Sequence, residues 1–285
     1  MRTSFDALDW ALALLFACAL GSCLFINWVV TRKRRSNERQ RQQTHQPPIS
    51  ILKPLCGFDE GLYENLVSFA EQRYPDFELI FAVADPRDAA LQAVERLRRE
   101  YPGVPTRVLA HGEDDPAANP KVISLQHMLR VARHELVLVS DSNVRVRPDY
   151  LSAIAAEMDD PSVGLVSNVI VGAGDKSLGA GCENLHLNTF VAGGVCVGDI
   201  TDRPVVVGKS MLMRRDQLLS LGGFDALRYI LAEDYVLGQR YHESGYRVVL
   251  SMHPIVTYNR RMGMLRFLSR HLRWAQLRLQ WSRLR

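Results

Sequence analysis

The chain has 285 residues, of which 47% are hydrophobic and 23% are charged, with a net charge of +4. This apolar content excludes a disordered chain, and the length suits one domain of about 210–220 residues with terminal attachments. Residues 1–41 hold seven Lys or Arg and three acids, residues 42–259 hold 20 and 28, and residues 260–285 hold eight and none. An acidic body between two basic ends argues against nucleic acid as a partner, because nucleic-acid-binding domains carry positive charge over the folded body.

The N-terminal region predicts a membrane anchor. Residues 10–30 are 21 uncharged residues in a row, and as a helix they would span about 31 Å, enough for a bilayer core. Arg2 is the only base before this span, whereas four bases fill positions 32–35 directly after it. The positive-inside rule therefore places residues 1–9 outside the membrane and the body in the cytoplasm. A cleaved signal peptide is disfavoured because its basic residues would precede the apolar run.

The rest of the chain divides into three predicted parts. Residues 31–48 are a basic polar tether that ends at two prolines, residues 49–259 are one folded body, and residues 260–285 are a basic amphipathic helix. Within the body, strands are expected at 49–53, 77–84, 106–110 and 135–139, the second and fourth of them buried, with helical patterns between them. This alternation predicts a parallel sheet with helices on both faces. Further apolar runs lie at 163–171 and 205–213, and further helices are predicted at 178–191 and 232–243.

Two acids stand where such sheets bind ligands, at the carboxyl ends of strands. Asp85 follows the second predicted strand, and Asp141 follows the fourth. Asp is also common in turns and at helix starts, so position alone leaves a structural role open. The dinucleotide fingerprint is missing, because Pro-Leu-Cys-Gly fills positions 54–57, and a Walker loop fails because Arg203 stands where its first Gly is needed. Hydride transfer and P-loop ATP hydrolysis are therefore disfavoured.

Six short motifs occur in order: Ile51-Leu52-Lys53-Pro54-Leu55, Ala84-Asp85-Pro86, Asn119-Pro120-Lys121, Asp141-Ser142-Asn143, Glu233-Asp234-Tyr235 and Arg270-His271-Leu272-Arg273-Trp274. Together they resemble the ceramide glucosyltransferase family and its bacterial hopanoid-glycosylating branch, processive-type GT-A enzymes with three aspartates followed by (Q/R)xxRW. The segment 206–215 is also similar to the family's strand before the third aspartate. The resemblance implies an α/β, GT-A-like fold, with a mostly parallel central sheet and flanking helices, plus one N-terminal transmembrane helix.

The resemblance also implies an activity: inverting transfer of a hexose, glucose or N-acetylglucosamine, from a UDP-sugar to a lipid hydroxyl. This reaction expels a nucleoside diphosphate, whose growing negative charge calls for a divalent cation or fixed cationic side chains. Asp141 and Asn143 offer hard oxygen ligands for Mg²⁺ or Mn²⁺. In the family pattern, Asp85 would hold the nucleoside and Asp141 the metal-bound diphosphate.

The third aspartate is the expected catalytic base. An inverting transfer needs a carboxylate that takes the acceptor's hydroxyl proton, and the resemblance gives this role to Asp234. The pair Glu233-Asp234 could instead serve as the acidic start of a helix. Lys53 and Lys121 are candidate nucleotide or phosphate contacts, although solvated surface lysines would look the same in the sequence.

The basic C-terminal segment has two compatible interpretations. Arg270 and Arg273 lie three residues apart on one helical face and could clamp diphosphate oxygens, and Trp274 could stack on a sugar. The same segment carries leucines at helical spacing among its arginines, which suits the headgroup layer of a membrane. A lipid acceptor would be met at that surface.

The chain departs from the family pattern at its end. Ceramide glucosyltransferases carry further membrane helices after the RxxRW element, whereas this sequence stops eleven residues past Trp274 and resembles a C-terminally truncated member. Two rivals remain: a polysaccharide synthase of the cellulose or hyaluronan type, which shares the motifs but needs several channel-forming helices, and an inactive membrane scaffold of the same fold. Only the scaffold would fail to bind a UDP-sugar.

Overall fold

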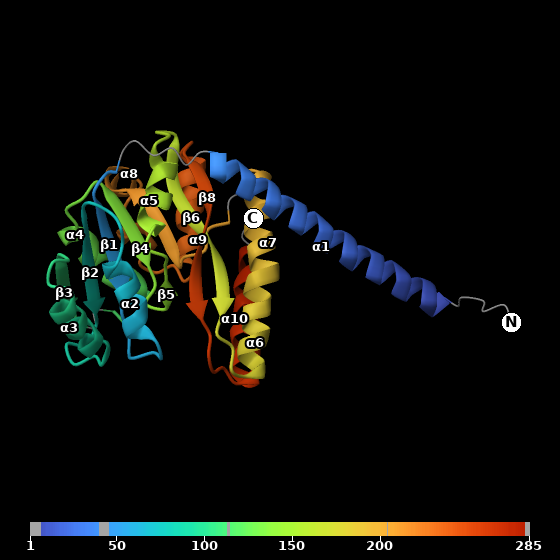
Figure 1. The fold of residues 1–285 in the computed structure, drawn as a ribbon, viewed down its shortest axis with the longest axis horizontal. Coiled ribbons are helices and arrows are strands. Elements are labelled where there is room, and N and C mark those ends of the chain that lie inside the picture. The colour runs from blue at the N-terminus through green and yellow to red at the C-terminus, as the bar shows by residue number, and fades with distance from the viewer. Residues whose placement is uncertain (1–6, 40–45, 113–114, 204, 283–285) are drawn as a thin grey trace.

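The computed structural model describes residues 7–39, 46–112, 115–203 and 205–282. In this part of the chain an α/β body contains an eight-stranded mixed sheet in the order β3-β2-β1-β4-β7-β6-β8-β5, and a long N-terminal helix extends away from it (Figure 1). The strands are β1 (Ile49–Pro54), β2 (Phe77–Val83), β3 (Thr106–Ala110), β4 (Leu136–Ser140), β5 (Val144–Arg145), β6 (Val163–Ala173), β7 (Ser210–Arg214) and β8 (Arg247–Tyr258).

The first half of the sheet follows the prediction. β1 pairs in parallel with β2 and β4, and β2 pairs in parallel with β3. Both ends of all four strands lie within one residue of the expected positions. β1, β2 and β4 are buried and largely apolar, which made them predictable, whereas β3 is a partly buried strand at the edge of the sheet. Their carboxyl ends meet at one edge of the sheet, which positions the candidate site.

The second half is less regular. β7 is antiparallel to both of its neighbours, β4 and β6, and it begins at Ser210, five residues later than the predicted run. β8, which pairs in parallel with β6, has no counterpart in the prediction. Its sequence contains Pro254, and the register between β6 and β8 shifts between Asn168 and Ile170, opposite this proline. Such an irregularity accommodates a residue that cannot donate to the ladder, and it also hides the strand pattern.

The helices cover both faces of the sheet (Figure 1). They are α1 (Ala7–Arg39), α2 (Leu62–Ala70), α3 (Ala90–Glu100), α4 (Pro120–Val131), α5 (Tyr150–Ala155), α6 (Leu178–His186), α7 (Ala192–Ile200), α8 (Arg215–Ser220), α9 (Glu233–Glu243) and α10 (Met264–Ser282), with short turns η1 (Ala156–Met158) and η3 (Asp225–Leu227) and a π-helical turn η2 (Leu187–Val191). One apolar cluster packs α2, α3 and α5 on one face, and a second packs α4 and α9 on the other. The predicted helix over 178–191 becomes the continuous series α6–η2–α7.

Helix α1 contains the predicted span. Among the described residues, one helix is long and apolar enough to cross a membrane, over Leu12–Lys33, and it continues as helix to Arg39 into the predicted tether. Within α1 the segment 26–33 packs on the body: Val29 is buried, and a Cβ on Gly193 of α7 would lie 2.9 Å from Ile26. Lys33 also pairs with Asp199 at 2.7 Å. Apolar packing and an ion pair therefore dock α1 against α7.

Candidate functional site

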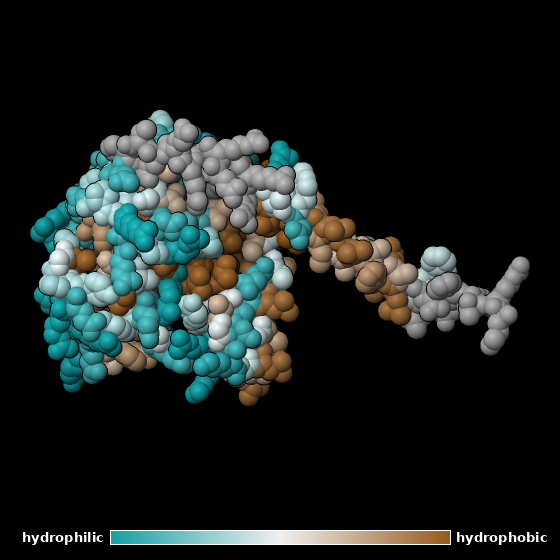
Figure 2. All heavy atoms as spheres, viewed as in Figure 1, coloured by the Kyte–Doolittle hydropathy of each residue, from teal (hydrophilic) through white to brown (hydrophobic). Residues whose placement is uncertain are grey.

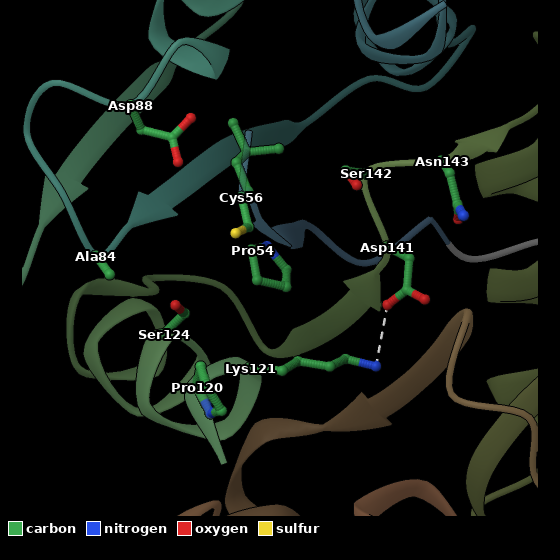
Figure 3. Close-up of a pocket in the computed structure, with 11 residues that line it drawn as sticks. Pro54, Cys56, Ala84, Asp88, Pro120, Lys121, Ser124, Asp141, Ser142 and Asn143 are labelled. Carbon is green, nitrogen blue, oxygen red and sulfur yellow. Dashed lines mark ion pairs between the residues drawn. The ribbon is translucent and has the colours of Figure 1, made fainter. Parts of the chain in front are cut away.

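A cavity of about 260 Å³ lies at the carboxyl ends of β1, β2 and β4, beside the start of α4 (Figure 3). Its lining comes from four segments that are far apart in the sequence: Pro54, Leu55 and Cys56; Ala84 and Asp88; Pro120, Lys121 and Ser124; Asp141, Ser142 and Asn143. Three of the predicted site residues, Lys121, Asp141 and Asn143, therefore face one cavity. This edge of the sheet is where open α/β folds bind ligands.

Asp141 is held between two lysines. Its Oδ1 lies 3.0 Å from Lys121 Nζ, a contact visible in Figure 3, and its Oδ2 lies 3.7 Å from Lys209 Nζ. Burial acts to raise the pKa of Asp141, but the charges of Lys121 and Lys209 outweigh it and leave the pKa below its ordinary value. Asp141 is therefore an anion at neutral pH, with the side chains of Lys121 and Lys209 on either side of it.

Lys121 connects the end of β4 to the start of α9. The side chain of Asn119 accepts from Lys121 N and Pro120 follows it, so the start of α4 is capped and fixed. Lys121 Nζ donates to the Gly208 carbonyl at 2.9 Å and pairs with Glu233 at 2.9 Å as well as with Asp141. Burial alone would lower the pKa of Lys121, but the two carboxylates raise it instead. The lysine stays protonated at neutral pH.

Lys53 has a supporting position beneath the cavity. Its side chain is fully buried, lies 3.8 Å from the Phe69 ring centroid, and donates to Ser140 Oγ and to the Asp141 carbonyl, both at 3.0 Å. Burial lowers the pKa of Lys53 to about 7, against the attraction of Asp141. Lys53 is thus not a solvated surface charge. It fixes the backbone that carries Asp141.

The two predicted metal ligands lie close to lysines. Asn143 Oδ1 accepts from Lys209 Nζ at 2.7 Å, and Asp141 pairs with both Lys121 and Lys209. In the described ranges, no group of three or more His, Cys, Asp or Glu side chains is placed to hold a metal ion. One carboxylate and one amide oxygen fit a hard divalent cation whose remaining ligands are diphosphate oxygens, which is the usual arrangement for Mg²⁺.

Asp234 lies next to this cluster at the start of α9. Its Oδ2 accepts from Gly208 N at 2.7 Å, and its Oδ1 accepts from Tyr235 N at 2.8 Å. Burial and the neighbouring Glu233 raise the pKa of Asp234, against the opposing charge of Lys121. The side chain therefore contacts backbone at the start of α9, where Ala232 is the N-cap and has no side-chain cap hydrogen bond, and its raised pKa makes it a stronger base than an ordinary aspartate.

Gly208 gives a direct test of this geometry. A Cβ on Gly208 would lie 2.8 Å from both Cβ and Oδ2 of Asp234, closer than real side chains approach. If Asp234 serves as the expected catalytic base, Gly208→Ala should displace its carboxylate and lower kcat by about 10²-fold, since a shift of about 1 Å can cost that much in catalysis. The measurement is steady-state transfer, with Gly194→Ala as the control because nothing lies within 4 Å of a Cβ there. Equal kcat values for Gly208→Ala and Gly194→Ala would contradict the placement of the Asp234 carboxylate against Gly208.

The C-terminal motif divides between two environments. Arg270 Nη2 lies 3.4 Å from Glu183 of α6, and its guanidinium lies 5.1 Å from the Trp274 ring centroid. Trp274 also neighbours the ring of His186 at 6.1 Å, whereas Arg273 is exposed on α10. The two arginines thus differ in their surroundings: one faces a buried carboxylate, and the other faces solvent.

Asp85 does not line the cavity. It is exposed after β2 and accepts from Arg87 N at 2.8 Å and Arg87 Nε at 3.3 Å, and these contacts lower its pKa. Asp88, on the same loop, does line the cavity and accepts from Gly57 N with both oxygens, at 3.0 and 2.9 Å. Both acids are visible in the sequence, but which one faces inward is not.

Three further charged residues were not assigned to the site from sequence: Lys209, Glu233 and Glu183. Lys209 directly precedes a strand, and Glu233 adjoins Asp234, so both lie within the motifs named above. What places Lys209 and Glu233 in the site is their contacts with residues far away in the sequence. Nothing in the local pattern distinguishes Glu183 from an ordinary helical glutamate.

The family comparison agrees with these motifs. The model of glycosyl transferase family 21 matches residues 14–284. Two curated relatives, ceramide glucosyltransferase 3 and ceramide glucosyltransferase 1 of Caenorhabditis elegans, are each 29% identical to the chain, over 261 and 279 residues. The matches cover 90% and 96% of this chain but 57% and 60% of the two relatives, so the chain spans less than two thirds of their length. The predicted resemblance is confirmed.

Solved structures agree on the fold. The mannosyltransferase PcManGT from Pyrobaculum calidifontis, in complex with GDP-Man and Mn²⁺, matches with a TM-score of 0.60 at 20% identity, over 86% of this chain and 66% of that one. TarS 1–349 of S. aureus, in complex with UDP-GlcNAc, matches with a TM-score of 0.52 at 17% identity, over 78% and 61%. At these identities the likeness concerns the fold alone, and the predicted GT-A-like fold is confirmed.

Proposed function

Because the chain belongs to glycosyl transferase family 21, we propose that it is a membrane-bound transferase that moves a hexose from a UDP-sugar to a lipid hydroxyl with inversion. The hexose is glucose or N-acetylglucosamine, and the acceptor is a ceramide- or hopanoid-type lipid reached from the cytoplasmic side. The observation that carries the proposal is the cluster of Lys121, Asp141 and Lys209 beside the cavity, with Asp234 next to it.

The cluster suits a diphosphate leaving group. Lys121 places an ammonium group beside Asp141, with Lys209 on the other side of the carboxylate, where negative charge grows as the sugar–phosphate bond breaks. A divalent cation bound by Asp141 and Asn143 would add further positive charge to the same oxygens. The protein's own part is to hold these charges in place before the reaction, through Lys53 beneath Asp141 and the fixed start of α4.

Asp234 suits the acceptor side. Its raised pKa makes the carboxylate a better proton acceptor than an ordinary aspartate, which is what abstraction of a hydroxyl proton requires. The bonds from Gly208 N and Tyr235 N orient both of its oxygens. The proton would move from the lipid hydroxyl to Asp234 while the acceptor oxygen bonds to the anomeric carbon and the diphosphate leaves from the opposite face.

Exposed apolar side chains support a lipid acceptor. Leu265, Leu268 and Leu272 of α10, Leu185 of α6 and Phe190 of η2 are each more than half exposed. Figure 2 shows apolar surface along α1 and on the side of the body that carries α6 and α7. Water-exposed apolar surface of this kind, among arginines, is typical of a helix that lies at a membrane interface.

The deciding experiment uses the full chain in lipid vesicles that contain ceramide or a hopanoid polyol. Labelled UDP-glucose or UDP-N-acetylglucosamine is added, and the lipid products are identified by mass spectrometry. One hexose on one lipid supports the proposal, whereas a polymer would indicate a polysaccharide synthase. Absence of both product and UDP-sugar binding by calorimetry would indicate an inactive scaffold.

We expect Mn²⁺ to bind appreciably only in the presence of UDP, because Asp141 and Asn143 supply too few ligands alone and both contact lysines. Calorimetric titration of Mn²⁺ with and without UDP measures this. Asn143→Asp is the matched variant: a second carboxylate should raise the Mn²⁺ affinity without UDP, whereas Asp141→Asn should remove it with UDP. The same Mn²⁺ affinity with and without UDP would contradict a site shared with the diphosphate.

A further inference from the structure

Asn65 is a polar side chain on the buried face of α2. Its exposed fraction is 4%, and the other buried residues of this helix are all apolar. An amide in such a position is costly unless its donor and its acceptor both find partners. The partners of Asn65 lie outside α2, in the turn after β4 and in β5.

Both ends of the amide are used. Asn65 Nδ2 donates to the Ser142 carbonyl at 3.2 Å, and Asn65 Oδ1 accepts from Arg145 Nε at 3.1 Å. A carbonyl can only accept and a guanidinium can only donate, so one orientation of the amide satisfies both partners. A carboxylate at position 65 would keep the bond from Arg145 and lose the bond to Ser142. An aliphatic side chain would lose both.

Ser142 is the middle residue of the turn Asp141-Ser142-Asn143, which carries the two proposed cation ligands. Lys53 of β1 also binds this turn, because its Nζ donates to the Asp141 carbonyl at 3.0 Å. Two consecutive carbonyls are thus each held by a side chain from a different element. The planar peptide groups on both sides of Ser142 are therefore fixed, and with them the spacing of Asp141 and Asn143.

Asn65 is the first of three polar residues, in α2 and directly after it, that bind the segment following β4. Ser68 Oγ accepts from Val146 N at 3.2 Å, and Gln72 Nε2 donates to the Arg147 carbonyl at 2.8 Å. Their spacing of three and four residues places them on one helical face. Asn65 bonds within the turn that carries the cation ligands, whereas Ser68 and Gln72 bond residues beyond it.

We propose that Asn65 is the positioning residue for this turn: by holding the Ser142 carbonyl, it sets the spacing of Asp141 and Asn143 for a divalent cation shared with the donor diphosphate. Mg²⁺ demands near-ideal octahedral geometry, so a small displacement of either ligand lowers the affinity for the cation. Outer contacts that orient the ligands of a metal site typically change its metal affinity 10–100-fold when they are removed. This inference rests on the proposed function.

The test is calorimetric titration of Mn²⁺ into the full chain in the presence of UDP, for the wild type and for Asn65→Asp. This variant keeps the side-chain size and the bond from Arg145 but loses the bond to Ser142. We expect the Mn²⁺ affinity to fall by at least about tenfold, with the affinity for UDP without metal changed less. An added negative charge would by itself attract the cation, so this loss has the opposite sign from a charge effect. Asn65→Ala adds no charge and carries the same expectation if Asn65→Asp does not fold.

Gln72→Glu is the matched control. It makes the same change from amide to carboxylate, keeps the bond from Leu151 N to the retained oxygen, and loses the bond to the Arg147 carbonyl. It should lower the melting temperature and leave the Mn²⁺ affinity with UDP unchanged. Wild-type Mn²⁺ affinity in the Asn65 variants, or an equal loss in Gln72→Glu, would overturn the inference. Hexose transfer by a wild-type chain that binds no Mn²⁺ would overturn the inference alone, whereas absence of transfer would overturn the proposed function and the inference with it.

Discussion

Asp234→Asn is expected to lower the turnover number by about 10²–10⁴-fold, the range that a positioned general base contributes. Asparagine keeps the size of the side chain and one acceptor oxygen but cannot take the acceptor's proton. UDP-sugar binding should remain close to that of the wild-type chain, because Asp234 contacts Gly208 and Tyr235 and does not line the cavity. Steady-state transfer together with calorimetric UDP binding measures both quantities, and near-normal turnover would exclude the base.

The same substitution is expected to stabilise the fold at neutral pH. The folded-state pKa of Asp234 is raised, so its ionised form costs stability, and that cost grows as pH rises from the ordinary carboxylate pKa through the folded one. The neutral amide of the variant would carry no such cost. The melting temperature of the variant should therefore exceed that of the wild-type chain at pH 7, and the gap should close at acidic pH.

Glu233→Gln gives the opposite expectation and serves as the control. Glu233 is as close in sequence as a control can be, but it pairs with Lys121 at 2.9 Å, so removing its charge should lower the melting temperature at neutral pH. The melting temperature should therefore change in opposite directions in the two variants. The charge of Asp234 costs stability and serves the proposed reaction, whereas the charge of Glu233 stabilises the fold by pairing with Lys121. Equal shifts in both variants would mean that Asp234 is an ordinary capping acid.

The predictable part of the fold is the part with a simple pattern. β1, β2 and β4 are buried along nearly their whole length, the edge strand β3 is partly buried, and the sequence pattern indicates the limits of all four to within one residue. β8 alternates buried with partly buried residues and carries Pro254 at a register shift, so neither the strand nor its pairing with β6 shows in the sequence. The antiparallel direction of β7 depends on long-range packing, which local periodicity does not encode.

The predictable part of the site is what the motif order covers. Lys121, Asp141 and Asn143 do meet at one cavity, and Asp234 does lie beside them. The motifs did not show which side chains contact one another or which of them face the cavity. Lys53, a predicted nucleotide contact, is buried under Asp141, and the acid that faces the cavity from the loop after β2 is Asp88 where Asp85 was expected. Such distinctions depend on which way a side chain points after the strands assemble.

Lys121→Met is expected to have the second large effect, on stability and donor binding together. Lys121 is the cation shared by Asp141 and Glu233, so its loss leaves the buried Glu233 and the partly buried Asp141 close to each other without it. Breaking a buried pair in this way typically costs about 3–5 kcal/mol of unfolding free energy. The donor KM should also rise at least tenfold, because the ammonium group of Lys121 beside the diphosphate is gone. Urea denaturation and steady-state transfer measure the two effects.

The pH dependence of the unfolding free energy distinguishes loss of the Lys121 charge from a simple packing defect. The folded-state pKa of Lys121 is raised, so its stabilisation is fully present at neutral pH and is lost only as pH rises through that folded value. In Lys121→Met the penalty should shrink on acidification, as the two carboxylates take up protons, whereas a packing defect would not change with pH.

Lys176→Met, at an exposed position, should alter the unfolding free energy by less than about 0.5 kcal/mol. Lys121→Arg should restore much of the stability but less of the donor affinity, because the guanidinium keeps the charge in a different geometry. A pH-independent loss in Lys121→Met would contradict the view that this lysine acts through its charge.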